Sequence, residues 1–189
     1  TKRNGLSEDW VTTSYRDKEG NLWFGHWTGG ISKYNVESRT FESIGIEEFL
    51  EIRSVTSIIQ DKDGNLWFGS NGSGVVKYEA KTNKIILINR TNGLSSNNIS
   101  CIMQDIYGNI WFGTDNGITI YNTRSDIASS ESFAFLNDAS GLPSNAVTQI
   151  KKAFENQVWV SLAGYGIVVF DMKNDVPLSK FASIPTHLI

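Results

Sequence analysis

Four stretches of the chain alternate apolar and polar residues with a period of two, and they are rich in β-branched side chains. They begin near Val11, Val55, Ile99 and Val147. This period and composition are typical of a half-buried β-strand. No segment shows a convincing helical period or a capping box. The pattern therefore predicts an all-β chain and excludes a parallel α/β fold.

Each alternating stretch is followed by a tight turn, a second strand, a turn that contains glycine, and two further strands. In the first three units the tight turn reads Asp-x-x-Gly-Asn, where Asp can cap the turn and Gly can adopt a positive φ. Asn156 replaces this Gly in the fourth unit. The second strand carries Leu-Trp-Phe-Gly or a related sequence. The predicted fourth strands read TFESI, KIILIN, SFAFLN and KFASI.

One tryptophan anchors each second strand, and successive anchors are 44, 44 and 48 residues apart. Four short strands in a unit of this length, with Trp and Gly at fixed places, describe a blade of a β-propeller. We therefore expect four blades of four antiparallel strands, in an open fragment of a larger propeller of about seven blades. The blades are predicted at about 4–46, 47–91, 92–139 and 140–189.

Residues that recur in every blade are predicted to be structural. A catalytic group need appear only once, whereas a side chain that packs between blades must appear each time. The recurring aromatic and small residues are Trp23, Trp67, Trp111, Trp159, Gly25, Gly69 and Gly113.

Composition narrows the functional classes. The formal net charge is −3 with both signs mixed, so no polyanion-binding surface is indicated and no nucleic-acid partner is expected. No apolar run approaches the roughly 18 residues that a membrane-spanning helix needs. Cys101 is the only cysteine and lies among apolar residues, so we expect a buried, inert thiol.

The sequence predicts no cofactor, no metal site and no catalytic residue. The stretch DKDG at 61–64 has the alternating carboxylates of a calcium loop, but Gly72 occupies the position where an EF-hand places its glutamate. Glu19 and Tyr107 replace Asp63 in the neighbouring units. The two histidines of the chain are too far apart in sequence to indicate a metal site.

The unit NGLSSNNISCIMQDIYGNIWFGTDNGITIYN resembles the two-component regulator propeller repeat, which has a Gly-Leu start, an Asp-x-x-Gly-x-Leu-Trp-x-Gly-Thr centre and a Gly-Leu-x-x-Tyr end. Units one to three match well and unit four loosely. The resemblance implies a propeller outside the cytoplasmic membrane, in the periplasm, as the sensing region of a hybrid histidine kinase. It also implies an oligosaccharide ligand, a signal to transcription control by phosphorelay, and output domains elsewhere in the parent chain.

Ligand contacts are expected in the loops at one end of the propeller. The loop that enters each first strand and the loop between the second and third strands should share that end. The candidate ligand-binding residues in these loops are Asp9, Arg53, Asn97, Asn145, His26, Trp27 and Tyr165. Alternatively, the polar side chains before the first strands only stabilise turns. Trp10 would then cover the exposed side of the first blade.

Two other functions remain open at this stage. One is a propeller lyase or hydrolase similar to the streptogramin lyases, which would need a clustered general base. The other is a scaffold whose loops bind protein. An open array of four blades would also leave apolar blade faces without partners, so the sequence predicts self-association of this fragment.

Overall fold

The structure of the protein is a computed structural model that describes residues 5–28, 30–43, 52, 54–125, 130–153, 156–172 and 187–188. Within these ranges the regular structure consists of β-strands and two 3-10 helices, Ser130–Ser132 (η3) and Asp138–Ser140 (η4). The all-β prediction is confirmed. The chain divides into two compact units, Thr1–Ile88 and Asn89–Ile189.

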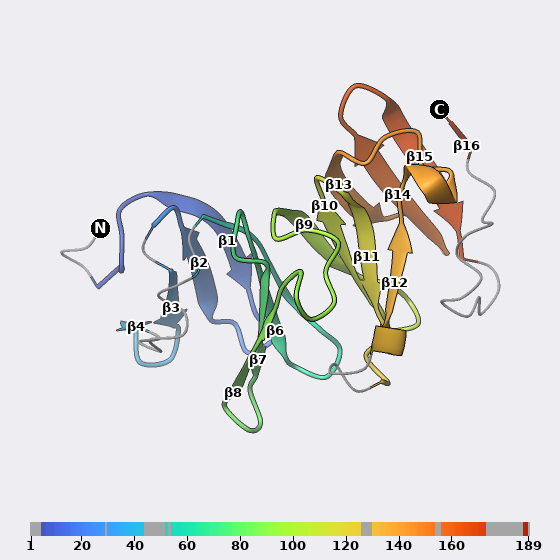
Figure 1. Cartoon of the computed structure of the whole chain (residues 1–189). Helices are drawn as coiled ribbons and strands as arrows, with labels where there is room; N and C mark the ends of the chain where they lie inside the picture. The colour runs from blue at the N-terminus through green and yellow to red at the C-terminus, as the bar shows by residue number, and fades with distance from the viewer. Residues whose placement is uncertain are drawn as a thin grey trace. The chain divides into compact units, whose positions relative to one another are not determined.

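The first unit contains two four-stranded antiparallel sheets in which strands adjacent in sequence are hydrogen-bonded neighbours (Figure 1). The first sheet comprises β1 (Val11–Arg16), β2 (Leu22–His26), β3 (Ile31–Asn35) and β4 (Thr40–Ser43). The second sheet comprises β5 (Val55–Gln60), β6 (Leu66–Ser70), β7 (Val75–Glu79) and β8 (Lys84–Ile88).

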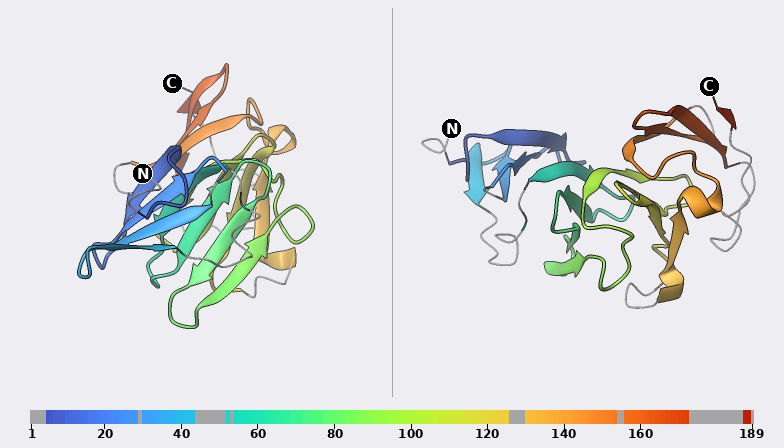
Figure 2. Two further views of the ribbon diagram at one scale, coloured as in Figure 1. Left: turned by 90° about the vertical axis from the view of Figure 1, so that its left-hand side faces the viewer. Right: turned by 45° about the horizontal axis from the view of Figure 1, so that its top comes forward.

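The second unit repeats this topology, with strands adjacent in sequence hydrogen-bonded to one another (yellow-green to red in Figure 2). Its first sheet comprises β9 (Ile99–Gln104), β10 (Ile110–Thr114), β11 (Gly117–Tyr121) and β12 (Phe133–Leu136). Its second sheet comprises β13 (Val147–Lys152), β14 (Gln157–Leu162), β15 (Gly166–Asp171) and β16 (His187–Leu188).

These four sheets have the strand number and meander order of propeller blades, which confirms the predicted β-propeller fold. The four first strands begin where the alternating pattern placed them. The predicted fourth strand KFASI, at 180–184, lies outside the described residues; β16 at His187–Leu188 pairs with β15 instead. The blade boundaries remain a prediction.

Apolar side chains between the two sheets of the first unit form its core. Trp23 from β2 contacts the second sheet, with its ring centroid 5.7 Å from that of Phe68 and 6.4 Å from that of Tyr78. Val55 and Val76 belong to the same buried cluster. Trp23 therefore packs between one blade and the next, as a structural wedge must.

The second unit is built on the same plan. Trp111 from β10 is fully buried, and the edge of its ring packs against Phe170 of β15 at a centroid distance of 5.8 Å. Ile120, Val147 and Val160 belong to the cluster that surrounds it. The tryptophan of the first blade in each unit thus inserts into the second blade of that unit.

A glycine in the second strand lets the next blade approach. A Cβ atom on Gly25 would lie 2.6 Å from Val55 Cγ1, and one on Gly113 would lie 2.8 Å from Val147 Cγ1. Both distances are too short for a real Cβ contact, so the close packing of the blades requires glycine at these two positions. Gly69 is buried at the equivalent place in β6.

The first strand of the first blade is less buried than the first strands of the second and fourth blades. Val11 is 40 % exposed, whereas Val55 is 0 % and Val147 is 4 % exposed. Ser14 is also exposed where the equivalent Ile58 and Ile150 are buried. The face of the first blade that carries β1 is therefore a solvent-exposed version of a surface that is buried on later blades.

We expect this exposed face to drive self-association of the chain, because the same surface packs against a preceding blade elsewhere in the molecule. Light scattering after size exclusion should show species larger than the 21.0 kDa monomer at high protein concentration. Val11→Lys should shift the population toward monomer. A monomer at all concentrations, without binding of dyes to apolar surface, would contradict the expectation.

Candidate functional site

Three buried aspartates in the Asp-x-x-Gly turns hold the indole groups of the repeated tryptophans. In each case the Trp Nε1–H donates to the Oδ2 atom of the aspartate six residues earlier. The pairs are Trp23 with Asp17 at 2.8 Å, Trp67 with Asp61 at 2.9 Å, and Trp111 with Asp105 at 2.9 Å. The turn and the wedge of each blade therefore form one hydrogen-bonded group.

Asp61 shows the full set of contacts. Its Oδ1 accepts hydrogen bonds from the backbone N–H groups of Asp63 (2.9 Å) and Asn65 (2.8 Å). Its Oδ2 accepts from Asn65 Nδ2 (2.9 Å) and Trp67 Nε1. A carboxylate that is only 1 % exposed is satisfied in this way by four donors. The sequence indicated the turn cap but not the indole contact, although the six-residue Asp–Trp spacing could have revealed it.

The fourth blade lacks this carboxylate. Ala153 stands in place of the aspartate, and its N–H still donates to Gln157 O at 2.9 Å, as the aspartate N–H does to the equivalent asparagine in the other blades. The Trp159 indole donates instead to Gln157 Oε1 at 3.2 Å and is only partly buried. The aspartate therefore anchors the tryptophan, whereas the hydrogen bond that closes the turn forms without it.

The opposite end of each blade contains the loops that the sequence singled out, and these loops contact one another as predicted. In the first unit the Trp27 N–H donates to Trp10 O at 3.2 Å, and the Ser54 N–H donates to Trp27 O at 2.6 Å. In the second unit the Gly117 N–H donates to Asn145 O at 2.8 Å. The entering loop and the loop between the second and third strands therefore share one end.

Two tryptophans outside the repeat form an exposed aromatic pair at this end. The rings of Trp10 and Trp27 are stacked, with centroids 6.0 Å apart and an interplanar angle of 26°. Trp10 is 67 % and Trp27 is 48 % exposed. The Glu8 carboxylate fixes the adjacent loop, because it accepts from Thr28 N at 2.7 Å and from Thr28 Oγ1 at 2.8 Å.

Asn97 and Asn145 have the same local contact in successive blades. Asn97 Oδ1 accepts from Arg90 N, and Asn145 Oδ1 accepts from Asp138 N, both at 2.8 Å. Both side chains are partly buried. Each oxygen stabilises the loop that enters its blade, which favours the alternative that these residues support turns.

His26 lies inside the first blade rather than on the loop surface. The side chain is 0 % exposed, and its Nε2 is 2.9 Å from Ser32 Oγ, which also accepts from Ser7 N at 2.9 Å. Burial lowers the pKa of His26, against the opposing effect of the Glu8 carboxylate. Ser70 and Thr114 occupy the equivalent buried position, so His26 is a polar core residue that a ligand at the surface does not reach.

The remaining candidates are scattered. Asp9 is exposed beside Trp10, and Tyr165 is 59 % exposed in the β14–β15 loop of the second unit. Arg53 lies outside the described residues. No cluster of three or more His, Cys, Asp or Glu able to hold a metal ion occurs in the part of the chain that the structure describes. Burial raises the pKa of the Cys101 thiol and so disfavours the reactive thiolate.

Three segments of the chain match the model of the family described as two component regulator propeller, at residues 5–28, 50–72 and 93–116. These three segments are similar to two-component regulator propeller repeats. Each matched repeat runs from the loop that enters the first strand to the loop that follows the second. The matched segments thus include both the Asp–Trp anchors and the loop end of the first three blades.

Solved structures with the same fold include extracellular domains of regulatory systems. The extracellular domain of BT3049 from B. thetaiotaomicron, described as a hybrid two-component system, superposes with a TM-score of 0.78 at 22 % identity. The extracellular domain of BT4673 from the same organism, described as a one-component system, has a TM-score of 0.74, also at 22 % identity. The superpositions cover 95 % and 97 % of this chain but only 24 % and 25 % of those chains. The propeller repeats of this chain thus span about a quarter of their length.

Virginiamycin B lyase from Staphylococcus aureus shares the fold with a TM-score of 0.64 at 16 % identity, covering 95 % of this chain and 55 % of the lyase. At this identity the likeness extends to the fold alone. No curated protein sequence matches the chain. Among the described residues, no helix is long and apolar enough to cross a membrane.

Proposed function

We propose that these propeller repeats form part of the ligand-sensing region of a membrane-bound two-component regulator, and that the ligand is an oligosaccharide. The family match supports a sensor propeller, and two of the similar structures are extracellular domains of regulators. The parent protein would hold the repeats in the periplasm. A histidine kinase elsewhere in that protein would pass the signal to transcription control.

The stacked Trp10–Trp27 pair is the observation that carries this proposal. Two large aromatic rings at a loop end are exposed to solvent, and the hydrogen bonds of Trp10 O and Glu8 fix their loops in place. A rigid frame that presents aromatic faces with polar neighbours suits the alternating apolar and hydroxyl-bearing faces of a sugar. Arg53, in the loop that enters the second blade, would bind a carboxylate or sulfate of the ligand in a bidentate manner.

The proposal assigns no enzymatic activity to this chain. One lyase neighbour is a catalytically inactive histidine-to-alanine variant of virginiamycin B lyase, solved with quinupristin. His26 is the only histidine whose side chain the structure describes, and it is fully buried against Ser32. A general base must reach the substrate directly or through one water, which this position prevents.

In the parent receptor, Trp27→Ala is expected to raise the inducer concentration needed for half-maximal response by about tenfold, because one face of the aromatic platform is lost. Arg53→Ala should act in the same direction. Dose–response curves of a reporter gene, measured over a panel of oligosaccharides, provide the test.

Phe135→Ala is the matched control, since Phe135 has nearly the same exposure (47 %) but belongs to strand β12 and not to a loop proposed to bind the ligand. Its curve should coincide with that of the parent protein. If Trp27→Ala and Arg53→Ala also leave the curve unchanged, these loops do not bind the inducer. A response to a purified protein partner in place of sugars would favour an interaction scaffold.

A further inference from the structure

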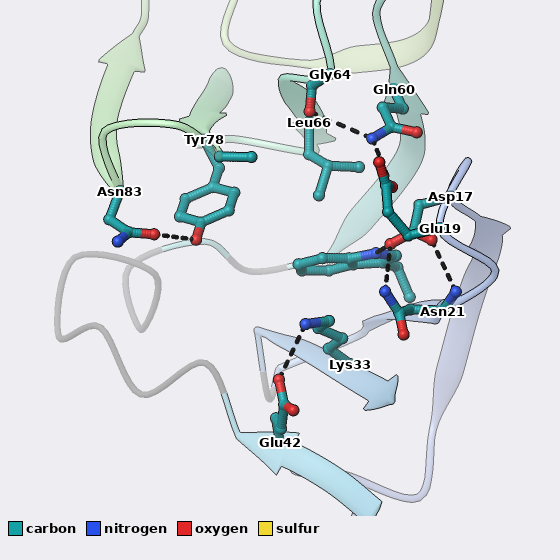
Figure 3. A pocket seen from close by; sticks show the side chains of 12 residues that line it. Asp17, Glu19, Asn21, Lys33, Glu42, Gln60, Gly64, Leu66, Tyr78 and Asn83 are labelled. Carbon is teal, nitrogen blue, oxygen red and sulfur yellow. Dashed lines mark hydrogen bonds and ion pairs between the residues drawn. The ribbon is translucent and has the colours of Figure 1, made fainter. Parts of the chain in front are cut away.

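A cavity of about 440 Å³, lined by both polar and apolar groups, lies between the two blades of the first unit, at the end of the Asp-x-x-Gly turns (Figure 3). Its size falls in the usual range for small-molecule pockets, roughly 300–1,000 Å³. It is lined by the turns of β1–β2, β5–β6 and β7–β8 and is therefore separate from the loop end with Trp27. No residue of the cavity belongs to the site proposed above.

The same place in the second unit is filled with apolar side chains. In the first unit, Trp23 is flanked across the sheet by Lys33 and then Glu42. In the second unit, Trp111 is flanked in the same register by Ile120 and then Ala134.

Two further positions follow the same pattern. Tyr107 replaces Glu19 and donates its hydroxyl hydrogen to Met172 O at 2.5 Å, while Phe170 replaces Tyr78. Ile120, Ala134, Tyr107 and Phe170 all pack in one core cluster of the second unit. The same positions of the repeat are therefore filled by apolar residues in the second unit and occupied by polar residues in the first.

The polar groups of the cavity are held in place by one another, as Figure 3 shows. Lys33 Nζ lies 3.0 Å from Glu42 Oε2. The hydrogen bond from Lys33 is the main reason that the pKa of Glu42 is lowered. Gln60 Nε2 donates to Glu19 Oε2 at 3.1 Å and to Gly64 O at 3.3 Å. The Tyr78 hydroxyl donates to Asn83 Oδ1 at 2.7 Å.

The chemistry of these groups limits the class of ligand. The charged residues that line the cavity are three carboxylates, Asp17, Glu19 and Glu42, and one ammonium, Lys33. This excess of negative charge repels an anion. Carboxylate, amide and hydroxyl groups line the cavity, so a ligand rich in hydroxyl groups fits better than an apolar one. Leu66 and the Trp23 ring supply an apolar wall.

We propose that the cavity between the first two blades is a second binding site, which takes a single non-anionic sugar residue. The site uses Glu19, Glu42, Gln60 and Tyr78 to bind hydroxyl groups, and it acts independently of the loop end. Its position at the Trp23 wedge couples occupancy to the packing of one blade on the next.

The test is a titration of the 189-residue chain, followed by the indole Nε1–H signal of Trp23 in nitrogen–proton correlation spectra. The probes are methyl β-D-glucopyranoside, glucosamine and glucuronate, which share a ring but differ in charge. The neutral and cationic probes should shift the Trp23 signal with millimolar affinity. Glucuronate should bind at least about tenfold more weakly, since like charges repel within the cavity.

Two tyrosine substitutions distinguish binding in the cavity from binding elsewhere on the chain. Glu19→Tyr copies the residue that fills the equivalent space in the second unit, and it should weaken binding of the glucoside at least about tenfold. Asp63→Tyr makes the same change at the equivalent residue of the β5–β6 turn, which does not itself line the cavity, and should leave binding unchanged. Gln60→Ala provides a second cavity variant if Glu19→Tyr does not fold.

Several results would overturn the proposal. These are a Trp23 signal that no probe moves, equal affinity in the parent and in both cavity variants, or tightest binding of glucuronate. Trp27→Ala should not affect this titration. The loop-end proposal can therefore fail while the cavity binds sugar, and the cavity can fail while the receptor still responds through its loops.

Discussion

Replacement of Trp111 by alanine is expected to lower the free energy of unfolding by roughly 3–5 kcal/mol, the usual cost of removing a large aromatic side chain from a core. The ring is fully buried and packs on Phe170, and its Nε1–H is bonded to the buried Asp105. The substitution removes the packing contacts and also one partner of the carboxylate. Urea denaturation followed by circular dichroism measures the change.

Trp159→Ala is the matched control for this experiment. Trp159 is the equivalent residue of the fourth blade, but it is only partly buried and bonds to Gln157 at 3.2 Å rather than to an aspartate. Its loss should therefore cost less than the loss of Trp111. Equal effects of the two substitutions would show that Trp111 has no special structural role. A Trp111→Ala variant with the same urea denaturation midpoint as the unsubstituted chain would show the same.

Replacement of Asp61 by alanine is expected to cost about 2–4 kcal/mol, because several buried donors lose their partner and each such group costs about 1–3 kcal/mol. The Trp67 indole is the most deeply buried of these donors. The closing hydrogen bond of the turn should persist, since Ala153 N donates to Gln157 O in the fourth blade without an aspartate. Thermal melting of the purified chain measures the loss.

Asp63→Ala controls for the removal of a carboxylate from this turn. Asp63 lies two residues further on and is exposed, so its replacement should change the free energy of unfolding by no more than about 0.5 kcal/mol. Destabilisation of the same size by both substitutions would mean that the turn depends on charge rather than on the indole anchor.

The strand plan could be predicted from the sequence because each blade repeats the same local signals. The alternation of apolar and polar residues located the start of β1, β5, β9 and β13, and the Asp-x-x-Gly turns fixed the ends of the first three of these strands. These signals are local, so one sequence is enough to detect them. The short β16 was not predicted, because its two residues, His187–Leu188, have no alternating pattern of their own.

The candidate site was harder to predict because it depends on which side chains the fold turns outward. His26 and Trp27 are neighbours in sequence, but His26 points into the blade toward Ser32 while Trp27 is exposed and stacks on Trp10. The stacking joins residues from two loops, which no periodicity reveals. The cavity near Lys33 and Glu19 was also not predicted. It is recognised only when the structure is compared with the equivalent space of the second unit, which apolar side chains fill.

The central claim is that the repeated residues build the frame while the unrepeated aromatic residues at the loop end bind the ligand. The most direct measurement compares Trp111→Ala with Trp27→Ala in the parent receptor, recording both melting temperature and dose–response. We predict a large fall in melting temperature for Trp111→Ala, and an unchanged melting temperature with a weakened response for Trp27→Ala. A Trp111→Ala receptor that melts like the parent yet fails to respond, or a Trp27→Ala receptor that is destabilised as strongly as Trp111→Ala, would contradict the claim.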